Sequence, residues 1–458
     1  MPRTLAAWGA AALVACASHD SPRPSAPRPT ASTAATTAAP APSAASAKPS
    51  ANVSSEARHP TLLITDLKVL AQLEQRGLSL ASVLGADATE LSNRELAQLP
   101  RFAPLVRELE REVERAAAAD KLAGVDVGRF SHRLFDRRFL RLAQARFVLA
   151  GVVNRPDRAP FDPESCGETR LIYRLAYALD AERASKLPMT LGVELQVPRG
   201  AAGCREAAAR WLEPSSAAAA EARATWLLSE QGPLSPALSR LGSAKGRFVV
   251  NWQLVRWPAT IRPDLGGHAE YLLRSFRADS AGALQPERLE NTVDPRALGD
   301  ARKRAELLAF LQQDAASIDA GTPLLPDSLL ATRALSVTPR GLHRLANRPF
   351  TAALGPTAFA DRDLSGGTFV KSNQGLLRRL DQLSCQGCHQ ARSVAGFHLL
   401  GEDAANVPAE NALAVAVSPQ VTADLPRRLR IAEQMLSGAL PDFSAPLAEH
   451  GRAEGGYG

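Results

Sequence analysis

Four long segments between residues 146 and 256 combine β-branched and aromatic residues with partial alternation of apolar and polar positions. They cover residues 146–153, 169–177, 190–197 and 247–256, and clusters of Gly, Pro and Asp separate them. Such segments favour strands over helices. Helical patterns lie before, between and after them, without a repeat of fixed period. The sequence therefore predicts an α+β body, with helices around a mixed or antiparallel sheet, at residues 60–350.

The helices are predicted from capping signals and apolar periodicity. Ser92-Asn-Arg-Glu95 has the spacing of a capping box, and a longer helix is expected from Pro104 to about Ala119. The charged run 107–115 offers pairs of opposite sign and predicts a solvated helix face. Further helices are expected at 203–212, 217–228, 301–313 and 369–383, and another strand at 268–277.

The first 59 residues differ in composition from the rest. Arg3 precedes an apolar run, 5–14, that is too short to span a bilayer and is typical of an export signal. Ala, Pro, Ser and Thr dominate residues 17–59, a composition that buries too little apolar surface to offset the entropy of ordering. We therefore expect an export signal at residues 1–15 and a disordered tether at 16–59.

Leu13-Val14-Ala15-Cys16 resembles the lipobox of bacterial lipoproteins. In that family the cysteine is acylated and becomes the mature N-terminus, so the resemblance implies a lipid on Cys16 as the membrane contact. Ala17, which follows in place of an aspartate, is similar to the residues found in outer-membrane lipoproteins. The implied location is the cell envelope, at the outer membrane and facing the periplasm or the surface. A plain secretory signal is the alternative.

Cys385, Cys388 and His389 form C-x-x-C-H, the spacing used for covalent attachment of haem c. Two thiols three positions apart can each add to one vinyl group, and the adjacent histidine can ligate the iron through an imidazole nitrogen. A reducible or structural disulfide and a zinc half-site are the alternatives. For zinc, the sequence contains no second C-x-x-C or H-x-x-x-H pair to complete four ligands.

Residues 369–398 resemble a c-type cytochrome, because a helix is expected to lead into the motif. The resemblance implies one haem c in a mainly helical C-terminal region, 361–458, with His389 as the proximal iron ligand. In that family a methionine or a second histidine often fills the sixth position, which makes Met435 and His398 the candidates here. Met435 also falls on an apolar helix face, so a place in the core is its alternative.

Cys166 and Cys204 remain if Cys16 carries lipid and the motif carries haem. Two leftover cysteines in an exported protein usually pair, so a disulfide is expected between them, with buried thiols as the alternative.

His268 and Glu270 share a face if they lie on a strand. No nucleophile or metal set accompanies them, which favours an ordinary polar junction over a binding or acid/base site.

These features predict an envelope lipoprotein that carries one covalent haem c and transfers electrons to an unidentified redox partner. The alternatives are a non-catalytic binding or scaffold protein with a structural Cys385–Cys388 disulfide, and an envelope enzyme coupled to the haem. A single motif disfavours a dihaem peroxidase, so the chain is not expected to be an enzyme by itself. The net charge is +7, but the arginines are dispersed, and nucleic-acid binding is not expected.

Overall fold

A computed structural model describes residues 61–122, 133–178, 184–213, 219–235, 246–256, 269–337, 347–359, 362–387 and 419–447. These residues fall in one compact unit, Asn52–Gly458. The expected signal and tether lie outside the described residues, and so do Cys16, Cys388, His389 and His398. Among the described helices, none is long and apolar enough to cross a membrane.

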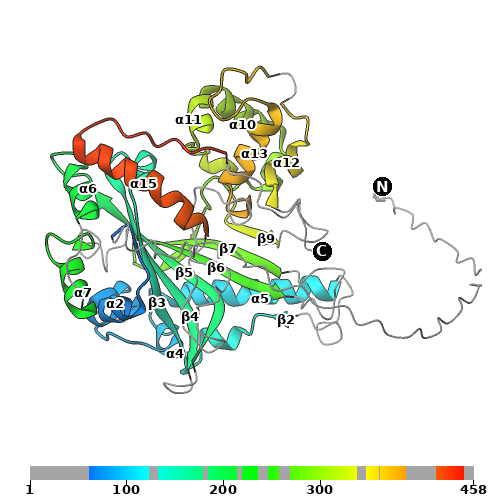
Figure 1. Ribbon diagram of the computed structural model, residues 1–458. Coiled ribbons are helices and arrows are strands. Elements are labelled where there is room, and N and C mark those ends of the chain that lie inside the picture. The colour runs from blue at the N-terminus through cyan, green and yellow to red at the C-terminus, as the bar shows by residue number, and fades with distance from the viewer. Residues whose placement is uncertain are drawn as a thin grey trace, which may run out of the picture. The chain divides into compact units, whose positions relative to one another are not determined.

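A nine-stranded sheet forms the centre of the fold (Figure 1). Its strands are β1 (Leu63–Ile64), β2 (Arg133–Leu134), β3 (Ala145–Arg155), β4 (Ser165–Ala178), β5 (Ala184–Pro198), β6 (Arg247–Arg256), β7 (Ala269–Ala278), β8 (Leu284–Glu287) and β9 (Arg333–Val337). All of these pairings are antiparallel, which confirms an α+β fold and narrows the predicted sheet to the antiparallel kind. The four predicted segments form β3 to β6, and the expected strand at 268–277 forms β7.

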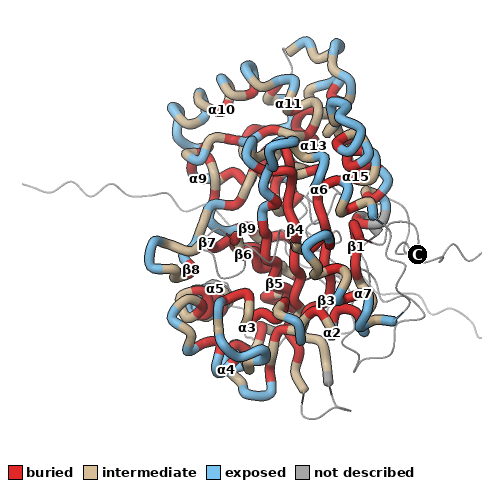
Figure 2. Tube along the Cα trace, turned by 90° about the vertical axis from the view of Figure 1, so that its left-hand side faces the viewer, coloured by how far each residue is buried: buried red, intermediate tan, exposed pale blue. Residues whose placement is uncertain are grey.

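The order of the sheet is β1-β3-β4-β5-β6-β7-β8. Two short strands extend it: β2 pairs with the last residues of β6, beyond the part that pairs with β5, and β9 pairs with β7 beside β8. Figure 2 shows β3 to β7 buried between the helices that cover the sheet.

The described helices surround this sheet. They are α2 (Leu67–Leu73), α3 (Leu80–Val83), α4 (Asn93–Leu96), α5 (Ala103–Leu122), α6 (Arg205–Leu212), α7 (Ala220–Leu228), α9 (Pro295–Leu298), α10 (Ala301–Gln313), α11 (Ala315–Ala320), α12 (Pro349–Leu354), α13 (Asn373–Leu383) and α15 (Pro419–Ser437), with the shorter turns η1 (Glu74–Leu78), η2 (Arg137–Leu140), η3 (Pro156–Phe161) and η5 (Asp327–Leu329). The predicted capping box is confirmed, because Ser92 and Glu95 exchange their two hydrogen bonds at the start of α4.

One face of the sheet packs against α2, α5 and α7 through the largest apolar cluster. Alternate side chains of the strands point to this face, as Tyr173, Leu191 and Val250 do, and contact the cluster that includes Leu109 of α5. The prediction of a solvated face on α5 was wrong for Glu108 and Glu112. Both carboxylates are buried, and both accept hydrogen bonds from Arg274 of β7.

The opposite face is covered at one end by α6 and α15. Met435 of α15 and Trp211 of α6 lie in this second cluster together with Cys166. The expected disulfide is present: Cys166, near the start of β4, is bonded to Cys204, which immediately precedes α6. The bridge therefore holds α6 against the strand that it covers.

Helices α9 to α13 form a third apolar cluster that contains no residue of the sheet strands. Helix α13 begins at Asn373, four residues later than predicted, because Ser372 caps it. The residues just before it are held elsewhere: the N–H groups of Phe369 and Val370 donate to Asp319 at 2.9 and 2.7 Å.

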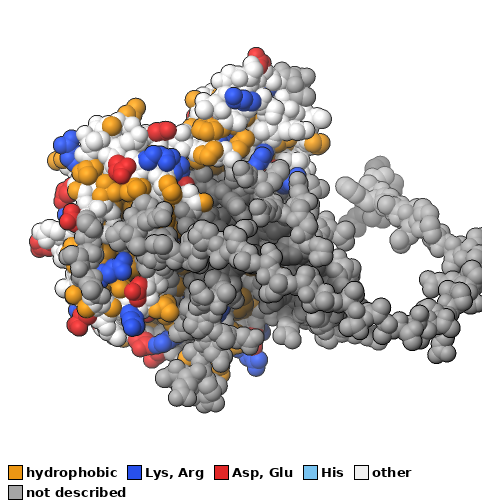
Figure 3. Space-filling view, in the orientation of Figure 1, with side chains coloured by type: hydrophobic (Ala, Val, Ile, Leu, Met, Phe, Trp, Pro, Cys, Tyr) orange, Lys and Arg blue, Asp and Glu red, His pale blue; other side chains and the backbone are white. Residues whose placement is uncertain are grey.

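On the described surface in view, Lys and Arg side chains are scattered among Asp and Glu (Figure 3).

Candidate functional site

Cys385 lies two residues after the end of α13, against strands β7 and β9. Its side chain is half-buried and packs against Leu273 of β7, Leu289 and Ala334 of β9. Its backbone N–H donates to the hydroxyl of Thr292 at 2.9 Å. The first cysteine of the predicted haem motif is thus fixed by its backbone and has an apolar wall on one side.

The turn after α13 is tightly closed. The hydroxyl of Ser384 donates to the carbonyl of Asp381 at 2.6 Å and accepts from the N–H of Gly387 at 3.1 Å. A Cβ on Gly387 would lie 1.8 Å from the carbonyl oxygen of Asp381, so only glycine fits at this position. The hydroxyl of Ser336, on β9, donates to the carbonyl of Gln386 at 3.3 Å and holds the same turn against the sheet.

The carboxyl of Asp381 connects this turn to α12. It accepts hydrogen bonds from the N–H groups of Phe350 and Thr351, at 2.8 and 3.3 Å, and from the hydroxyl of Thr351. Burial nevertheless raises the pKa of Asp381 to about 6. Asp381, four positions before Cys385, therefore titrates at mildly acidic pH.

The structure does not bring Met435 and Cys385 together. Met435 is buried in the cluster of α6 and α15, as its helical pattern also suggested, whereas Cys385 belongs to the separate group around Leu273. Cys388, His389 and His398 lie outside the described residues, as do Cys16 and His268. Glu270, the predicted neighbour of His268, lies on β7.

Asn251 of β6 lies directly across from Leu273 in the sheet, so the two side chains share a face. Its amide is 2% exposed, and neither its Oδ1 nor its Nδ2 has a hydrogen-bond partner among the described residues. Buried amides are almost always hydrogen-bonded in folded proteins. The amide of Asn251 is thus an exception to this rule on the face of the sheet that Leu273 shares.

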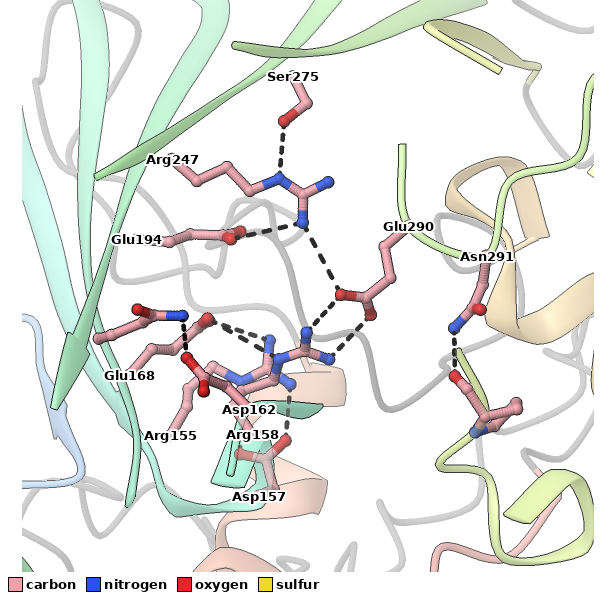
Figure 4. Close-up of polar contacts among 12 residues, drawn as sticks. Arg155, Asp157, Arg158, Asp162, Glu168, Glu194, Arg247, Ser275, Glu290 and Asn291 are labelled. Carbon is pink, nitrogen blue, oxygen red and sulfur yellow. Dashed lines mark hydrogen bonds and ion pairs between the residues drawn. The ribbon is translucent and has the colours of Figure 1, made fainter. Parts of the chain in front are cut away.

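The segment from Leu289 to Thr292 joins Cys385 to a group of buried charges. Leu289 and Thr292 contact Cys385, whereas Glu290 points the other way, toward Arg158 (Figure 4). Asn291, between Glu290 and Thr292, has a φ of 51°, in the left-handed region. Its side chain holds that conformation by donating to the carbonyl of Pro323 at 2.9 Å and accepting from Leu325 at 3.0 Å.

Arg158, Glu168, Glu194, Arg247, Arg277 and Glu290 line a cavity of about 150 Å³, which we call the polar pocket. Arg158 forms two parallel hydrogen bonds with Glu290. Arg247 donates to Ser275 at 2.8 Å and to the carbonyl of Arg288 at 2.9 Å. Its Nη1 atom lies 3.7 Å from Glu290 and 3.9 Å from Glu194 (Figure 4).

The pKa values of the three glutamates of the polar pocket are shifted in different directions. Burial opposes ionisation of Glu290, but Arg158 and Arg247 outweigh it and hold the pKa at about 2. Burial likewise raises the pKa of Glu168, and the nearby guanidinium groups, Arg170 first, bring it below its ordinary value. For Glu194 burial prevails, and its pKa is raised although Arg170 donates to it at 2.7 Å. Glu194 is therefore the glutamate that most readily takes up a proton.

The rim of the polar pocket comes from the loop between η3 and β4 and from β5. Gln196 donates to Asp162 at 2.5 Å, and Arg158 lies over the ring of Phe161, 3.8 Å from its centroid. Gly167 has φ of 120°, and a Cβ there would lie 2.2 Å from the carbonyl oxygen of Arg155. Only glycine can therefore stand at this point in the pocket wall.

Behind the polar pocket, the charges continue into α15. Asp157 is buried between Arg155, which donates to it at 2.6 Å, and Arg427 and Arg428 of α15, at 3.4 Å each. These arginines outweigh the effect of burial and hold the pKa of Asp157 well below its usual range. The C-terminal helix is thus bound to the body by buried ion pairs as well as by apolar contacts.

One local pattern in the sequence indicates this network of buried charges. Glu168 and Arg170 stand two positions apart in β4, so they share one face. Within the described ranges, no group of three or more His, Cys, Asp or Glu residues is arranged to hold a metal ion. No protein-family model, curated protein or solved structure matches the chain.

Proposed function

We propose that this protein is an exported lipoprotein that holds one haem c through Cys385 and Cys388 and transfers electrons in the cell envelope. His389 is the proposed proximal iron ligand, and Cys16 the proposed lipid attachment point. The observation that carries the proposal is the position of Cys385, which stands beside an apolar wall with arginine charge nearby.

The surroundings of Cys385 suit one edge of a haem. Leu273, Leu289 and Ala334 present apolar surface to it, as the ring and its vinyl groups require. Arg247 lies within electrostatic reach of Cys385. The unpartnered amide of Asn251 adds a polar group on the same face of the sheet.

The described residues have defined tasks in this proposal. Haem supplies an iron that accepts and releases one electron. Thr292 fixes the backbone of Cys385, Gly387 lets the chain turn between the two thiols, and the wall around Leu273 excludes water on that side. These contacts hold the first attachment point against β7 and β9.

The sequence offers two candidates for the sixth ligand of the iron. Met435 would have to leave the cluster of α6 and α15 in order to reach an iron beside Cys385. His398 lies nine positions after His389 in the sequence. We therefore place His398 ahead of Met435 in this role.

Intact-mass spectrometry tests the attachment. The chain is co-produced with haem-attachment machinery, denatured, and weighed. The proposal predicts that the mass of one haem stays on the wild-type chain and is lost in the variant Cys385→Ala/Cys388→Ala. A wild-type chain that carries no added mass under these conditions refutes it.

The polar pocket favours a second candidate function, the binding of a ligand by an envelope protein whose Cys385 and Cys388 form a structural disulfide. The same mass measurement separates the two candidates. A disulfide removes two hydrogens from the chain and adds no cofactor.

A further inference from the structure

We infer that the polar pocket binds a small, neutral, polyhydroxylated molecule, such as a single sugar ring. The inference concerns residues of the sheet, η3 and Glu290, and it holds whichever group Cys385 and Cys388 carry. It extends the proposed function by giving the body of the protein a ligand of its own.

The first argument is the spacing of the charged atoms. Arg247 Nη1 lies 3.7 Å from Glu290 and 3.9 Å from Glu194, and Arg158 Nε lies 3.8 Å from Glu168. These distances allow electrostatic attraction but exceed those of a hydrogen bond. Arg247 Nη1 and the Glu194 oxygen that faces it therefore retain hydrogen-bonding capacity, whereas the facing oxygen of Glu290 already accepts from Arg158.

The second argument is the mixture of charges. A carboxylate placed at Arg247 Nη1 would come close to Glu194 and Glu290, and an ammonium placed at Glu194 would come close to Arg247. A hydroxyl group avoids both conflicts, because it accepts from a guanidinium and donates to a carboxylate at once. Neighbouring hydroxyl groups on one ring repeat this pattern. The lining thus selects neutral hydroxyl groups against charged ones.

The third argument is size. The polar pocket has a volume of about 150 Å³. Pockets for drug-sized ligands measure about 300–1,000 Å³. The polar pocket therefore suits one small ring whose outer edge reaches the rim, and it is too small for a haem.

The rim supports the same class of ligand. Gln196 and Asp162 are joined at 2.5 Å and add an amide and a carboxylate at the opening, both of which suit hydroxyl groups. The ring of Phe161 already has Arg158 over its face, so it contributes little free surface for stacking. Polar contacts, rather than stacking, are expected to dominate binding.

Saturation-transfer NMR on the purified full-length chain tests the inference. The neutral probes are D-glucose, D-galactose, N-acetyl-D-glucosamine and myo-inositol, and the charged probes are L-glutamate, L-arginine and citrate. We expect at least one neutral probe to bind saturably with a Kd of about 1–10 mM, and no charged probe to bind as tightly.

The matched variants are Glu194→Gln, Arg247→Lys and Gln196→Ala in the polar pocket, and Arg76→Gln in an exposed ion pair with Glu221. Loss of a hydrogen bond to a charged group weakens binding by about tenfold. We expect this for Glu194→Gln and Arg247→Lys, a smaller loss for Gln196→Ala, and none for Arg76→Gln. Because Gln196 is exposed, its variant remains informative if a buried substitution unfolds the chain.

Three outcomes would overturn the inference. The first is a charged probe that binds more tightly than every neutral one. The second is the lack of saturable binding by all four neutral probes. The third is neutral binding that is unchanged in every folded variant of the polar pocket.

Discussion

The backbone N–H of Cys385 donates a hydrogen bond to the side-chain hydroxyl of Thr292 at 2.9 Å. Thr292 is fully buried, and Glu290, two positions earlier, reaches the polar pocket through Arg158. One short segment therefore contacts both the predicted attachment point and the buried charges. Residues 93 positions apart in the chain are joined by this single bond.

The variant Thr292→Val tests that bond. Valine keeps the shape of threonine but leaves the N–H of Cys385 without its acceptor, which costs about 1–3 kcal/mol. We expect the free energy of unfolding in urea to fall by that amount. Thr225→Val removes an exposed hydroxyl that donates to Glu221, and it should change stability by less than about 0.5 kcal/mol. Equal effects of the two variants would contradict the role of Thr292.

The variant Gly387→Ala tests the turn within the motif. Its Cβ would lie 1.8 Å from the carbonyl oxygen of Asp381, so the backbone has to move, at a cost of about 1–3 kcal/mol. Gly366→Ala is the control, because a Cβ there meets no atom within 4 Å. Urea unfolding of both variants measures the difference. A Gly387→Ala protein as stable as Gly366→Ala would show that the turn is not closed as described.

Asp381 makes stability depend on pH. Its pKa is raised from 3.8 to about 6 in the folded chain, so the folded state binds a proton more readily than the unfolded state. Its contribution is therefore fully present below about pH 4 and is lost as the pH rises to about 6, by up to about 3 kcal/mol.

We expect the variant Asp381→Asn to lack this loss between pH 4 and pH 6. The measurement is the free energy of unfolding of wild type and variant across that range. Asp363→Asn is the control, since Ser365 lowers the pKa of the exposed Asp363 and its titration falls below the window. Parallel pH profiles of wild type and Asp381→Asn would refute the assignment.

The disulfide between Cys166 and Cys204 is expected to stabilise the fold by about 3–4 kcal/mol, because it closes a loop with a sequence separation of 38. The free energy of unfolding in urea should be lower by that amount in the double variant Cys166→Ala/Cys204→Ala. A reductant should bring wild type close to the variant and leave the variant unchanged. Wild type that unfolds at the same urea concentration with and without reductant would contradict the bridge.

Local chemistry made much of the fold predictable. Alternating β-branched segments gave β3 to β6, the spacing of Ser92 and Glu95 gave the start of α4, and cysteine counting gave the disulfide. The onset of α13 was misplaced because Asp319, far away in the sequence, captures the residues before it. Glu112 appeared solvated because its partner, Arg274, lies on a strand that the helical pattern does not reveal.

The polar pocket was not predictable from spacing in the chain. Arg158 meets Glu290 across 132 positions, and Arg427 meets Asp157 across 270. Such pairs depend on how η3, the segment after β8 and α15 pack together around the sheet, which no local pattern in the chain specifies. The alternation of Glu168 and Arg170 within β4 was the one local sign that this face carries charge.

The measurement that tests the central claim most directly is a pyridine haemochrome spectrum. The chain is produced with the haem-attachment machinery and extracted with acid acetone, which removes haem that is not covalently bound. The account predicts that the c-type absorbance stays with wild type and disappears in Cys385→Ala/Cys388→Ala, while Cys166→Ala/Cys204→Ala retains it. A wild-type chain without absorbance after extraction would contradict the account and leave Cys385 and Cys388 as a disulfide pair.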